Sequence, residues 1–521
     1  MANKAKFQAI KGTRDLLPPE TELWNRVEQT AREVFGTFGF GEIRPPIFEP
    51  TELFARAVGG ETDIVSKEMY SFEDARGDLQ EMREMIRNYA LPATDEHWTN
   101  AFLGLLRNFQ TRLEAGIRSG EVEHHQEAHA FYDYFSQGIT HFQAELSHGV
   151  ETNKPEIDRT FRLLKLAVAG VTLGPSVCLR PEATASVCRA YIEHGMQQWP
   201  APVKLYYMGP MFRRERPQKG RYRQFYQIGA EVLGGTDAPG IDAEVIEMVM
   251  AFFGRLELQG AQLEINSIGH SAPNCRRGYV EKLKAALVEV KDKLGADSQR
   301  RIATNPLRVL DSKLEHEQAI IEKLPRIADS LCDDCKSYYA EVKRQLDLRG
   351  VAYRENWRLV RGLDYYMRTT FEITAQGLGS QNAVCGGGRY DGLVELLGGP
   401  PTKGIGFAIG EDRLILSLQE AGGGTATGRD VYIAWMGEKA QATAIAAARK
   451  LREAGLRVEL PPVEQKFGKA LGQADKLGAK FALILGEDEV ASGEWTVKRL
   501  ADGTQEKVNG EAVVEFLKRK K

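Results

Sequence analysis

Five arginines and one lysine lie in a short loop between two apolar runs near the middle of the chain. The loop spans Arg213–Arg223, and the flanking runs Lys204–Met208 and Phe225–Val232 are expected to form strands. Guanidinium groups are planar and match phosphate oxygens bidentately, so such a hairpin is suited to hold a polyphosphate or the end of an RNA. Taken alone, a solvated basic loop accounts for the same residues about equally well.

A second stretch, Leu359–Tyr366, places a cation beside a glycine and two aromatic hydroxyls. Arg361 precedes Gly362, and Tyr365 and Tyr366 follow shortly after. A positive charge and hydroxyl groups therefore lie close to one point. A pair of packed tyrosines at the end of a strand explains the pattern about as well as a binding site does.

A third stretch, Gly404–Leu414, combines glycines with an arginine. Its glycines permit a close approach to the backbone, and Arg413 lies at the start of an expected helix. On its own this pattern is weak evidence for a site.

In this order along the chain, the three stretches resemble the class II aminoacyl-tRNA synthetases. The basic hairpin and the glycine-rich stretch are similar to the second and third signature motifs of that class. Phe40–Pro50 is similar to the first motif, which builds the dimer interface in this family. Within the class, Leu179–Thr184 and Leu359–Tyr366 look like the histidine-recognition segments of the histidyl enzymes, and Glu61–Tyr70 and Cys385–Gly392 also match them. The resemblance covers nearly the whole chain except residues 77–172.

This resemblance implies ATP-dependent attachment of L-histidine to tRNA(His) through a histidyl-adenylate, with release of pyrophosphate and AMP. The attacking carboxylate is already ionised, so catalysis depends on positioning and on neutralising charge at the α-phosphorus. An arginine-rich site without an obvious nucleophilic serine or cysteine suits that chemistry. ATP is expected as a substrate with Mg²⁺, and no prosthetic group is expected.

The resemblance also implies roles for individual residues. The expected catalytic cations are Arg213 on the α-phosphate, Arg361 between the substrate carboxylate and that phosphate, and Arg413 on the distal phosphates. The residues expected to bind ATP are Arg213, Glu215, Arg221, Phe225 and Arg413. Those expected to bind histidine are Glu182, Thr184, Gln227, Glu231, Arg361, Tyr365 and Tyr366. Because a buried polar pocket rejects an amino acid that leaves it unpaired by roughly 10⁴-fold or more, no editing domain is expected.

Two positions depart from the family pattern. Glu411 follows Gly410 where the family usually has an apolar residue, and Ala183 replaces a more usual glycine. A pairing of Glu411 with a neighbouring arginine is one explanation of the first departure.

At 521 residues the chain is too long for one core, and changes in pattern divide it. The expected fold is α+β. An antiparallel-sheet catalytic domain would comprise residues 1–76, 173–269 and 351–420. A helical insert of unknown role would occupy residues 77–172, and a second helical insertion domain residues 270–350. Alternating strands and helices predict a separate α/β domain at residues 429–521, and the resemblance implies that it binds the anticodon.

Composition favours a cytoplasmic protein of several domains, and the family resemblance implies a homodimer. With 42% apolar and 27% charged residues the chain is expected to be globular, and it has no apolar run long enough to span a membrane. The net charge of −3 argues neither for nor against an RNA partner. The six cysteines are sparse and irregular, as in a reduced compartment.

One cysteine pair suggests a metal. Cys332 and Cys335 form a C-x-x-C pair, and Cys275 is a third candidate ligand. A structural zinc site normally has four ligands, and no second paired half is present. Helix-packing cysteines are therefore the favoured interpretation, and no metal site is expected.

Two other functions compete with this interpretation. A regulatory subunit, such as the one that partners ATP phosphoribosyltransferase, resembles only the catalytic domain and generally lacks the basic motifs, whereas Arg213, Arg361 and Arg413 are present here. A class II synthetase for threonine, proline or glycine would share the C-terminal module. The segment from Arg361 to Tyr366 speaks against that alternative.

Overall fold

The computed structural model describes residues 7–59, 62, 64–73, 78–88, 96–119, 125–148, 154–170, 175–360, 365–376, 382–422 and 428–520. The chain forms two compact units. The first contains residues 1–14 and 28–421, and the second contains residues 15–27 and 422–521. Each unit is described by itself, and the four-part division expected from the sequence stays a prediction.

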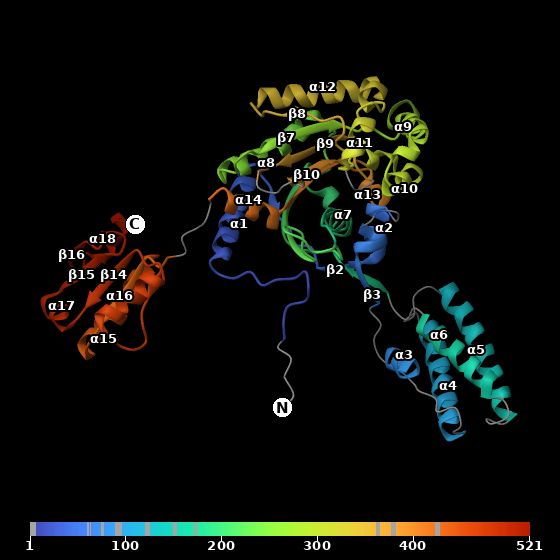
Figure 1. Cartoon of the computed structure of the whole chain (residues 1–521), viewed down its shortest axis with the longest axis horizontal. Helices are drawn as coiled ribbons and strands as arrows, with labels where there is room; N and C mark the ends of the chain where they lie inside the picture. Colours follow the sequence, from blue (N-terminus) through green and yellow to red (C-terminus); the bar gives the residue numbers. More distant parts are fainter. Residues whose placement is uncertain are drawn as a thin grey trace. The chain divides into compact units, whose positions relative to one another are not determined.

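An eight-stranded sheet is the centre of the first unit (Figure 1). Its strands, in spatial order, are β1 (Gly41–Glu42), β5 (Val203–Phe212), β6 (Gln224–Leu233), β11 (Gly404–Gly410), β10 (Ala383–Arg389), β9 (Met367–Thr374), β7 (Gln262–Ser267) and β8 (Arg354–Glu355). The short edge strands β1 and β8 pair in parallel with their neighbours, and the other pairs are antiparallel. The predicted α+β fold with an antiparallel sheet is confirmed.

The basic loop joins the two longest strands of this sheet. β5 and β6 pair antiparallel from Val203 with Leu233 to Phe212 with Gln224. The predicted hairpin is therefore confirmed, and each strand is longer than its apolar run. The arginines begin where the ladder ends, so the hairpin carries them beyond the edge of the core.

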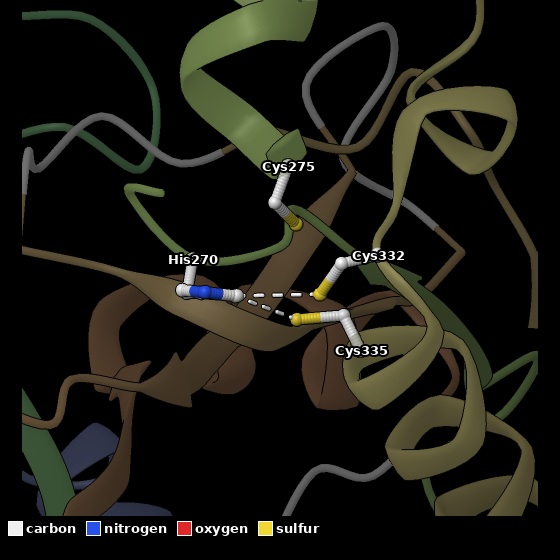
Figure 2. Close-up of side chains that lie close together, drawn as sticks. All are labelled: His270, Cys275, Cys332 and Cys335. Atoms are coloured by element: carbon white, nitrogen blue, oxygen red, sulfur yellow. Dashed lines mark hydrogen bonds between the residues drawn. The ribbon is translucent and has the colours of Figure 1, made fainter. Parts of the chain in front are cut away.

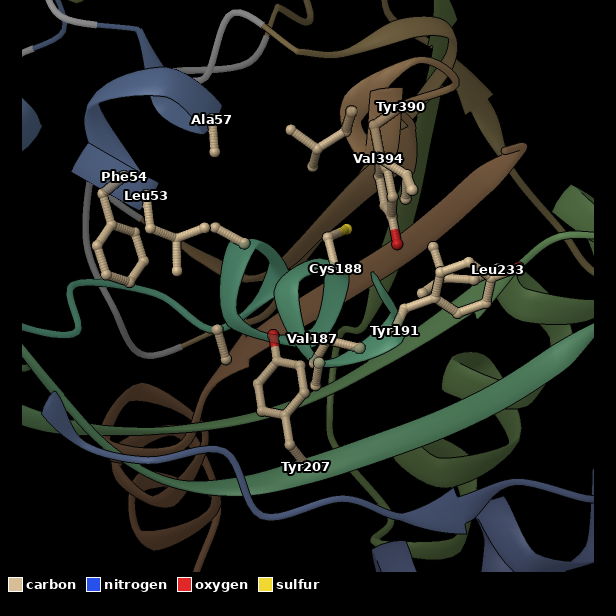
Figure 3. Packing of buried hydrophobic residues seen from close by; sticks show 14 of the residues in the cluster. Leu53, Phe54, Ala57, Val187, Cys188, Tyr191, Tyr207, Leu233, Tyr390 and Val394 are labelled. Atoms are coloured by element: carbon tan, nitrogen blue, oxygen red, sulfur yellow. The ribbon is translucent and has the colours of Figure 1, made fainter. Parts of the chain in front are cut away.

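Helices cover both faces of the sheet. Successive residues of a strand point to opposite faces, so each strand contributes side chains to both layers. Tyr206 of β5 lies on one face, where its ring packs edge-on against Phe35 of helix α1 (Glu20–Thr37). Phe35 also contacts Phe252 of helix α8 (Pro239–Arg255). Tyr207 points to the other face and packs in a cluster with helices α2 (Thr51–Val58) and α7 (Thr184–Glu193), as Figure 3 shows.

A buried ion pair fixes two helices to the sheet. Arg389 of β10 is 1% exposed, and its Nε lies 3.1 Å from Oδ1 of Asp242 in α8. The hydroxyl of Tyr338, in helix α12 (Asp333–Leu348), donates to the same carboxylate at 3.1 Å. Asp391 accepts a further bond from Arg389 at 2.8 Å. Because breaking a buried pair leaves an uncompensated charge, this contact determines where α8 and α12 sit.

The first unit contains a small second sheet. It has the order β2 (Phe48–Pro50), β4 (Ser176–Leu179), β3 (Tyr70–Glu73). Phe48 and Phe72 are 59% and 45% exposed, and their rings meet edge to face with centroids 5.8 Å apart. This sheet therefore presents an aromatic pair to the surface.

The segment between β3 and β4 forms four helices in its described part, in agreement with the helical pattern of the sequence. They are α3 (Asp78–Asn88), α4 (Glu96–Ser119), α5 (His125–Ser147) and α6 (Lys154–Gly170). They enclose a core of their own, in which Phe102 contacts Phe142 and Phe161, and Phe109 contacts Phe135.

The segment between β7 and β8 is also helical. It contains α9 (Gly278–Glu289), α10 (Ala296–Thr304), α11 (Glu315–Ile321) and α12, joined by short turns. Its core includes Tyr279 and Leu283 and extends to Val360 and Tyr366, which lie outside the segment. This helical region therefore shares its core with the segment just before β9, which carries Tyr365 and Tyr366.

The second unit has a five-stranded mixed sheet in its C-terminal part, in agreement with the expected α/β domain. The order is β13 (Val458–Glu459), β12 (Val431–Trp435), β14 (Phe481–Leu485), β15 (Glu494–Arg499), β16 (Gln505–Asn509). Helices α15 (Glu438–Glu453), α16 (Phe467–Lys476), α17 (Glu487–Ser492) and α18 (Val513–Lys520) accompany it. The first three strands are parallel, and β15 and β16 add an antiparallel edge.

Candidate active site

A cavity of about 400 Å³ opens between the basic hairpin and the strands β10 and β11. Helix α14 (Glu411–Glu420) begins at its edge. Six of the residues selected from the sequence line it: Arg213, Glu215, Arg221, Phe225, Gln227 and Arg413. The structure therefore brings the basic hairpin and the glycine-rich stretch Gly404–Leu414 together at one place.

The strand β6 explains why three of the selected residues share one side. Phe225, Gln227 and Glu231 are spaced by two or four, so their side chains leave the same face. Gly229 lies between them, and a Cβ there would come within 2.3 Å of the ring of Tyr207. Only glycine lets that tyrosine cross the strand toward the site.

Small residues form the floor of the cavity. Gly386 of β10 pairs with Ala408 of β11, and Gly410 pairs with Gln227. A Cβ on Gly406 would lie 1.7 Å from Oε2 of Glu231, which packs directly on that backbone. The close approach expected of the glycine-rich stretch is thus present, and here it makes room for a protein carboxyl group.

Glu215 holds two of the arginines. Nη1 of Arg221 lies 3.2 Å from one of its oxygens, and Nη1 of Arg213 lies 3.7 Å from the other. Arg213 also donates from Nε to the carbonyl of Pro181 at 2.9 Å, and its guanidinium lies 5.1 Å from the centre of the Phe225 ring. These contacts fix the direction of the cation before any anion arrives.

Arg413 is held on the opposite side. Its Nη1 donates to the carbonyl oxygen of Ala383 at 2.7 Å. Burial and then the like charge of Arg221 lower the pKa of Arg413 from its ordinary value. An anion between Arg221 and Arg413 would relieve this repulsion, so the cavity is electrostatically prepared for phosphate.

Beside the cavity lies a buried pair of carboxyl groups joined by one threonine. The hydroxyl of Thr184 donates to Oε1 of Glu231 at 2.7 Å. The backbone N–H groups of Thr184 and Ala185 donate to the two oxygens of Glu182 at 2.7 and 3.0 Å. Glu182 and Glu231 are 4% and 1% exposed, so both depend on these donors in place of water.

The two carboxyl groups have perturbed pKa values. Burial raises the pKa of Glu231 to about 8, although bonds from Tyr390 and Thr184 oppose the rise, and the charge of Glu182 adds to it. Burial also raises the pKa of Glu182, against the donors at residues 184 and 185 and the charge of Arg213. Near neutral pH, Glu231 therefore carries a proton that it can share with a basic ligand.

Tyrosines surround the pair. The rings of Tyr365 and Tyr366 lie 4.7 Å apart, and Tyr365 lies 5.8 Å from Tyr390. The hydroxyl of Tyr390 donates to Oε2 of Glu231 at 2.5 Å, and Tyr207 is fully buried nearby. Sequence reasoning did not select Tyr207 or Tyr390, because their contacts depend on glycines in neighbouring strands.

Three other positions singled out in the sequence are Arg361, Ala183 and Glu411. Arg361 lies outside the described residues, so its role stays a prediction. Ala183 is fully buried against α7 and is accommodated there. Glu411 is 1% exposed, and neither of its oxygens has a hydrogen-bond partner in the described part of the chain. Burial, together with the charges of Glu28 and Asp412, raises its pKa well above the ordinary value, so a hydrogen-bonded pairing with arginine does not explain this departure.

A second cavity of about 710 Å³ shares a wall with the first. Arg213, Glu215 and Arg221 line both. The second cavity adds four further cations from the segment after β2 and from the helical region around α10: Lys67, Arg300, Arg301 and Arg308. It is therefore a strongly basic hollow that opens beside the smaller one.

Comparisons with known proteins agree with this geometry. A family model described as histidyl-tRNA synthetase matches residues 143–414, and one described as an anticodon binding domain matches residues 430–520. A histidine–tRNA ligase from Koribacter versatilis is 46% identical over 506 residues, covering 96% of this chain and 94% of the relative. The apo histidyl-tRNA synthetase of Staphylococcus aureus superposes with a TM-score of 0.65 at 32% identity, covering 98% of this chain and 100% of that one.

A third comparison bears on the competing interpretation. A Bacillus halodurans structure described as an ATP phosphoribosyltransferase regulatory subunit/histidyl-tRNA synthetase has a TM-score of 0.54 at 17% identity and covers 93% of this chain. At that identity the likeness extends to the fold alone.

Proposed function

Because the chain belongs to the histidyl-tRNA synthetase family, we propose that its two adjoining cavities serve the two steps of one reaction. The protein is a ligase that attaches histidine to tRNA. The smaller cavity and the carboxyl pair beside it would bind ATP and histidine. The larger basic cavity would receive the end of the tRNA.

In the first step, a carboxylate oxygen of histidine attacks the α-phosphorus, the P–O bond to pyrophosphate breaks, and pyrophosphate leaves. Arg213 would hold the α-phosphate, and Arg221 and Arg413 the distal phosphates, with Phe225 stacked on adenine. Arg361 would bridge the carboxylate and the α-phosphate. Losing one such contact typically removes about 2.7–4 kcal/mol of transition-state stabilisation.

ATP would arrive as its magnesium complex. Glu215 and Glu372 are carboxylates that line the ATP cavity. Carboxylate and phosphate oxygens are the ligands that Mg²⁺ takes in nucleotide sites.

The carboxyl pair would select histidine. Glu182, Thr184 and Gln227 would face the ammonium group, and the side-chain oxygen of Gln227 is buried without a hydrogen-bond partner among the described residues. Glu231 and Tyr366 would face the two imidazole nitrogens, with Tyr365 packed behind them. An amino acid that cannot form hydrogen bonds with these buried groups would bind more weakly, because burying polar groups without that partner costs free energy.

In the second step, the terminal adenosine hydroxyl of tRNA attacks the carbonyl carbon of the adenylate, and AMP leaves. The acceptor end would reach that carbon along the basic cavity. Its shared wall with the ATP cavity, formed by Arg213, Glu215 and Arg221, is the observation that carries this assignment. The C-terminal five-stranded domain would bind the anticodon.

We expect histidine alone to support exchange of labelled pyrophosphate into ATP, with threonine, proline and glycine as parallel substrates. On this assignment the imidazole of histidine pairs with Glu231, and the side chains of the other three offer it no imidazole nitrogen. Folding is verified by circular dichroism. Absence of exchange with every amino acid, from folded protein, would contradict the assignment and favour the regulatory-subunit interpretation.

The pKa of Glu231 predicts a bell-shaped dependence of kcat/KM for histidine on pH. Free imidazole titrates at a pH of about 6.5, and Glu231 has a pKa of about 8. Between these two pH values Glu231 is protonated and the substrate imidazole is neutral, so the pair holds the one proton that a Glu–imidazole bond needs. Below this window an imidazolium meets a protonated carboxyl group, and above it a neutral imidazole meets a carboxylate, so the pair holds one proton too many or one too few. The value of kcat/KM should therefore fall on both sides of this pH window.

Two variants separate the upper limb from the titration of the substrate ammonium. Glu231→Gln should remove that limb and lower kcat/KM by about 10- to 100-fold, since a hydrogen bond to a charged group contributes about 1.5–3 kcal/mol. Tyr390→Phe should move the limb to higher pH, because the Tyr390 hydroxyl lowers the pKa of Glu231. An upper limb unchanged in both variants would assign it to another group.

The basic cavity is tested by Arg300→Ala and Arg308→Ala. Each should raise the KM for tRNA and reduce the dependence of its logarithm on the logarithm of salt concentration by about one unit. Histidine-dependent pyrophosphate exchange should stay unchanged. Arg344→Ala, on the exposed side of α12, is the matched control. Exchange that falls together with tRNA charging would place these arginines in the first step instead.

We propose that the protein acts as a cytoplasmic homodimer. The aromatic pair Phe48 and Phe72 is exposed on the small sheet that includes the end of the first signature motif, which supports an interface there. Among the described helices, none is long and apolar enough to cross a bilayer. Light scattering should give twice the chain mass of 58.1 kDa, and Phe48→Glu should shift it toward the monomer. A monomeric wild-type protein would contradict the proposal.

A further inference from the structure

Four side chains with metal-binding atoms meet at the base of the helical region between β7 and β8. They are His270, Cys275, Cys332 and Cys335, and their ligand atoms all lie within 4.8 Å of one another. Figure 2 shows the imidazole of His270 pointing between the sulfurs of Cys332 and Cys335, with Cys275 approaching from the other side. The group lies apart from both cavities described above.

The distances in this group suit a tetrahedral ion. Nδ1 of His270 lies 3.1 Å from Sγ of Cys335 and 3.8 Å from Sγ of Cys332. Around zinc, bonds of about 2.3 Å to sulfur and 2.0–2.1 Å to nitrogen place tetrahedral ligands about 3.5–3.8 Å apart. The four atoms therefore need only small shifts to enclose an ion.

We propose that His270, Cys275, Cys332 and Cys335 bind a structural zinc ion. Three thiolates and one imidazole are a ligand set that zinc prefers, and four protein ligands leave no open position for a substrate. Packing of small apolar cysteines, the interpretation favoured from the sequence, does not account for an imidazole directed at two sulfurs. All six cysteines of the chain are free, so no disulfide competes for these thiols.

The backbone around the ligands is shaped to hold them. Cys332 caps helix α12 and Cys335 lies in its first turn, so the start of one helix presents both sulfurs. Gly269 has φ +62°, and a Cβ there would come within 2.7 Å of Sγ of Cys275. A side chain at residue 269 would therefore push Cys275 out of the group.

The ion would join the start of the inserted segment to the start of its last helix, α12. His270 and Cys275 lie where the chain leaves β7 and enters α9, whereas the other two ligands begin α12. His270 is 62 and 65 residues from Cys332 and Cys335 in sequence. Closing a long loop costs the chain conformational entropy. The free energy of binding one ion would offset this cost and stabilise the folded chain, as a disulfide at the same place would.

The same group is connected to the proposed histidine pocket. The guanidinium of Arg276, next to Cys275, donates to the carbonyl oxygen of Tyr366. Asp334, between the two paired cysteines, accepts from Arg368 of β9 at 2.7 Å. The ion would therefore hold the tyrosine segment in place through its neighbours in the chain.

The first experiment uses the full-length wild-type protein. Mass spectrometry of the purified chain should find about one zinc per chain. Protein stripped with a strong chelator and reloaded with Co²⁺ should show the intense visible bands of tetrahedral cobalt and a near-ultraviolet thiolate-to-cobalt band. Substoichiometric zinc after growth in zinc-supplemented medium, together with absence of these cobalt bands, would overturn the proposal.

Variants then identify the ligands. Cys332→Ser and His270→Ala should lower zinc affinity by about tenfold or more, as loss of a supporting group already does at other metal sites. His270→Cys should keep the ion, because four thiolates also bind zinc tetrahedrally, whereas a packing role predicts no such rescue. Cys178→Ser, a buried cysteine outside the group, is the matched control and should keep full zinc content. Equal zinc content in Cys332→Ser and wild type would overturn the assignment.

The structural role has its own readout. Chelation should lower the midpoint of thermal unfolding of the wild type and leave that of Cys332→Ser unchanged. It should also raise the KM for histidine more than that for ATP, and this kinetic readout alone rests on the proposed function. Zinc bound at full stoichiometry whose removal changes neither stability nor KM would overturn the structural role.

Discussion

Two carboxyl groups in one dry pocket are the constraint around which the rest of the site is arranged. Glu182 and Glu231 are removed from water, and each must find donors from the protein or hold a proton. The start of α7 supplies two backbone N–H groups and the Thr184 hydroxyl. The glycine floor of β11 then leaves the space that Glu231 fills. Selectivity for a small polar ligand follows from this arrangement, because only a ligand with matching groups replaces what burial removed.

Much of the site could be predicted because its residues follow strand periodicity or stand beside glycine in recognisable stretches. The hairpin, the arginines that extend from it and the helix start at Arg413 all depend on neighbours in sequence. Phe225, Gln227 and Glu231 share a face for the same local reason. The C-terminal α/β domain also follows from the pattern, because its strands and helices alternate along the chain, whereas the antiparallel sheet of the first unit was expected from the family resemblance.

The rest depends on contacts between segments that are distant in sequence. Tyr207 reaches the pocket only because Gly229 lies on the neighbouring strand, and no spacing in the sequence reveals that pairing. His270 was missed as a partner of the C-x-x-C pair because it lies 62 residues from Cys332, outside any familiar ligand spacing. Glu411 has no described hydrogen-bond partner, and local pattern could not indicate that an acidic residue would be buried there.

The wall shared by the two cavities couples the binding equilibria on its two sides. Glu215 bridges Arg213 and Arg221, and all three residues face both hollows. A ligand that draws one arginine away from Glu215 changes the charge presented on the other side. By thermodynamic reciprocity, the occupant of the second hollow changes the affinity of the first by the same factor. On the proposed assignment of the cavities, a small inhibitor placed in either hollow would act on the binding of both substrates, and its potency would depend on whether the RNA is bound.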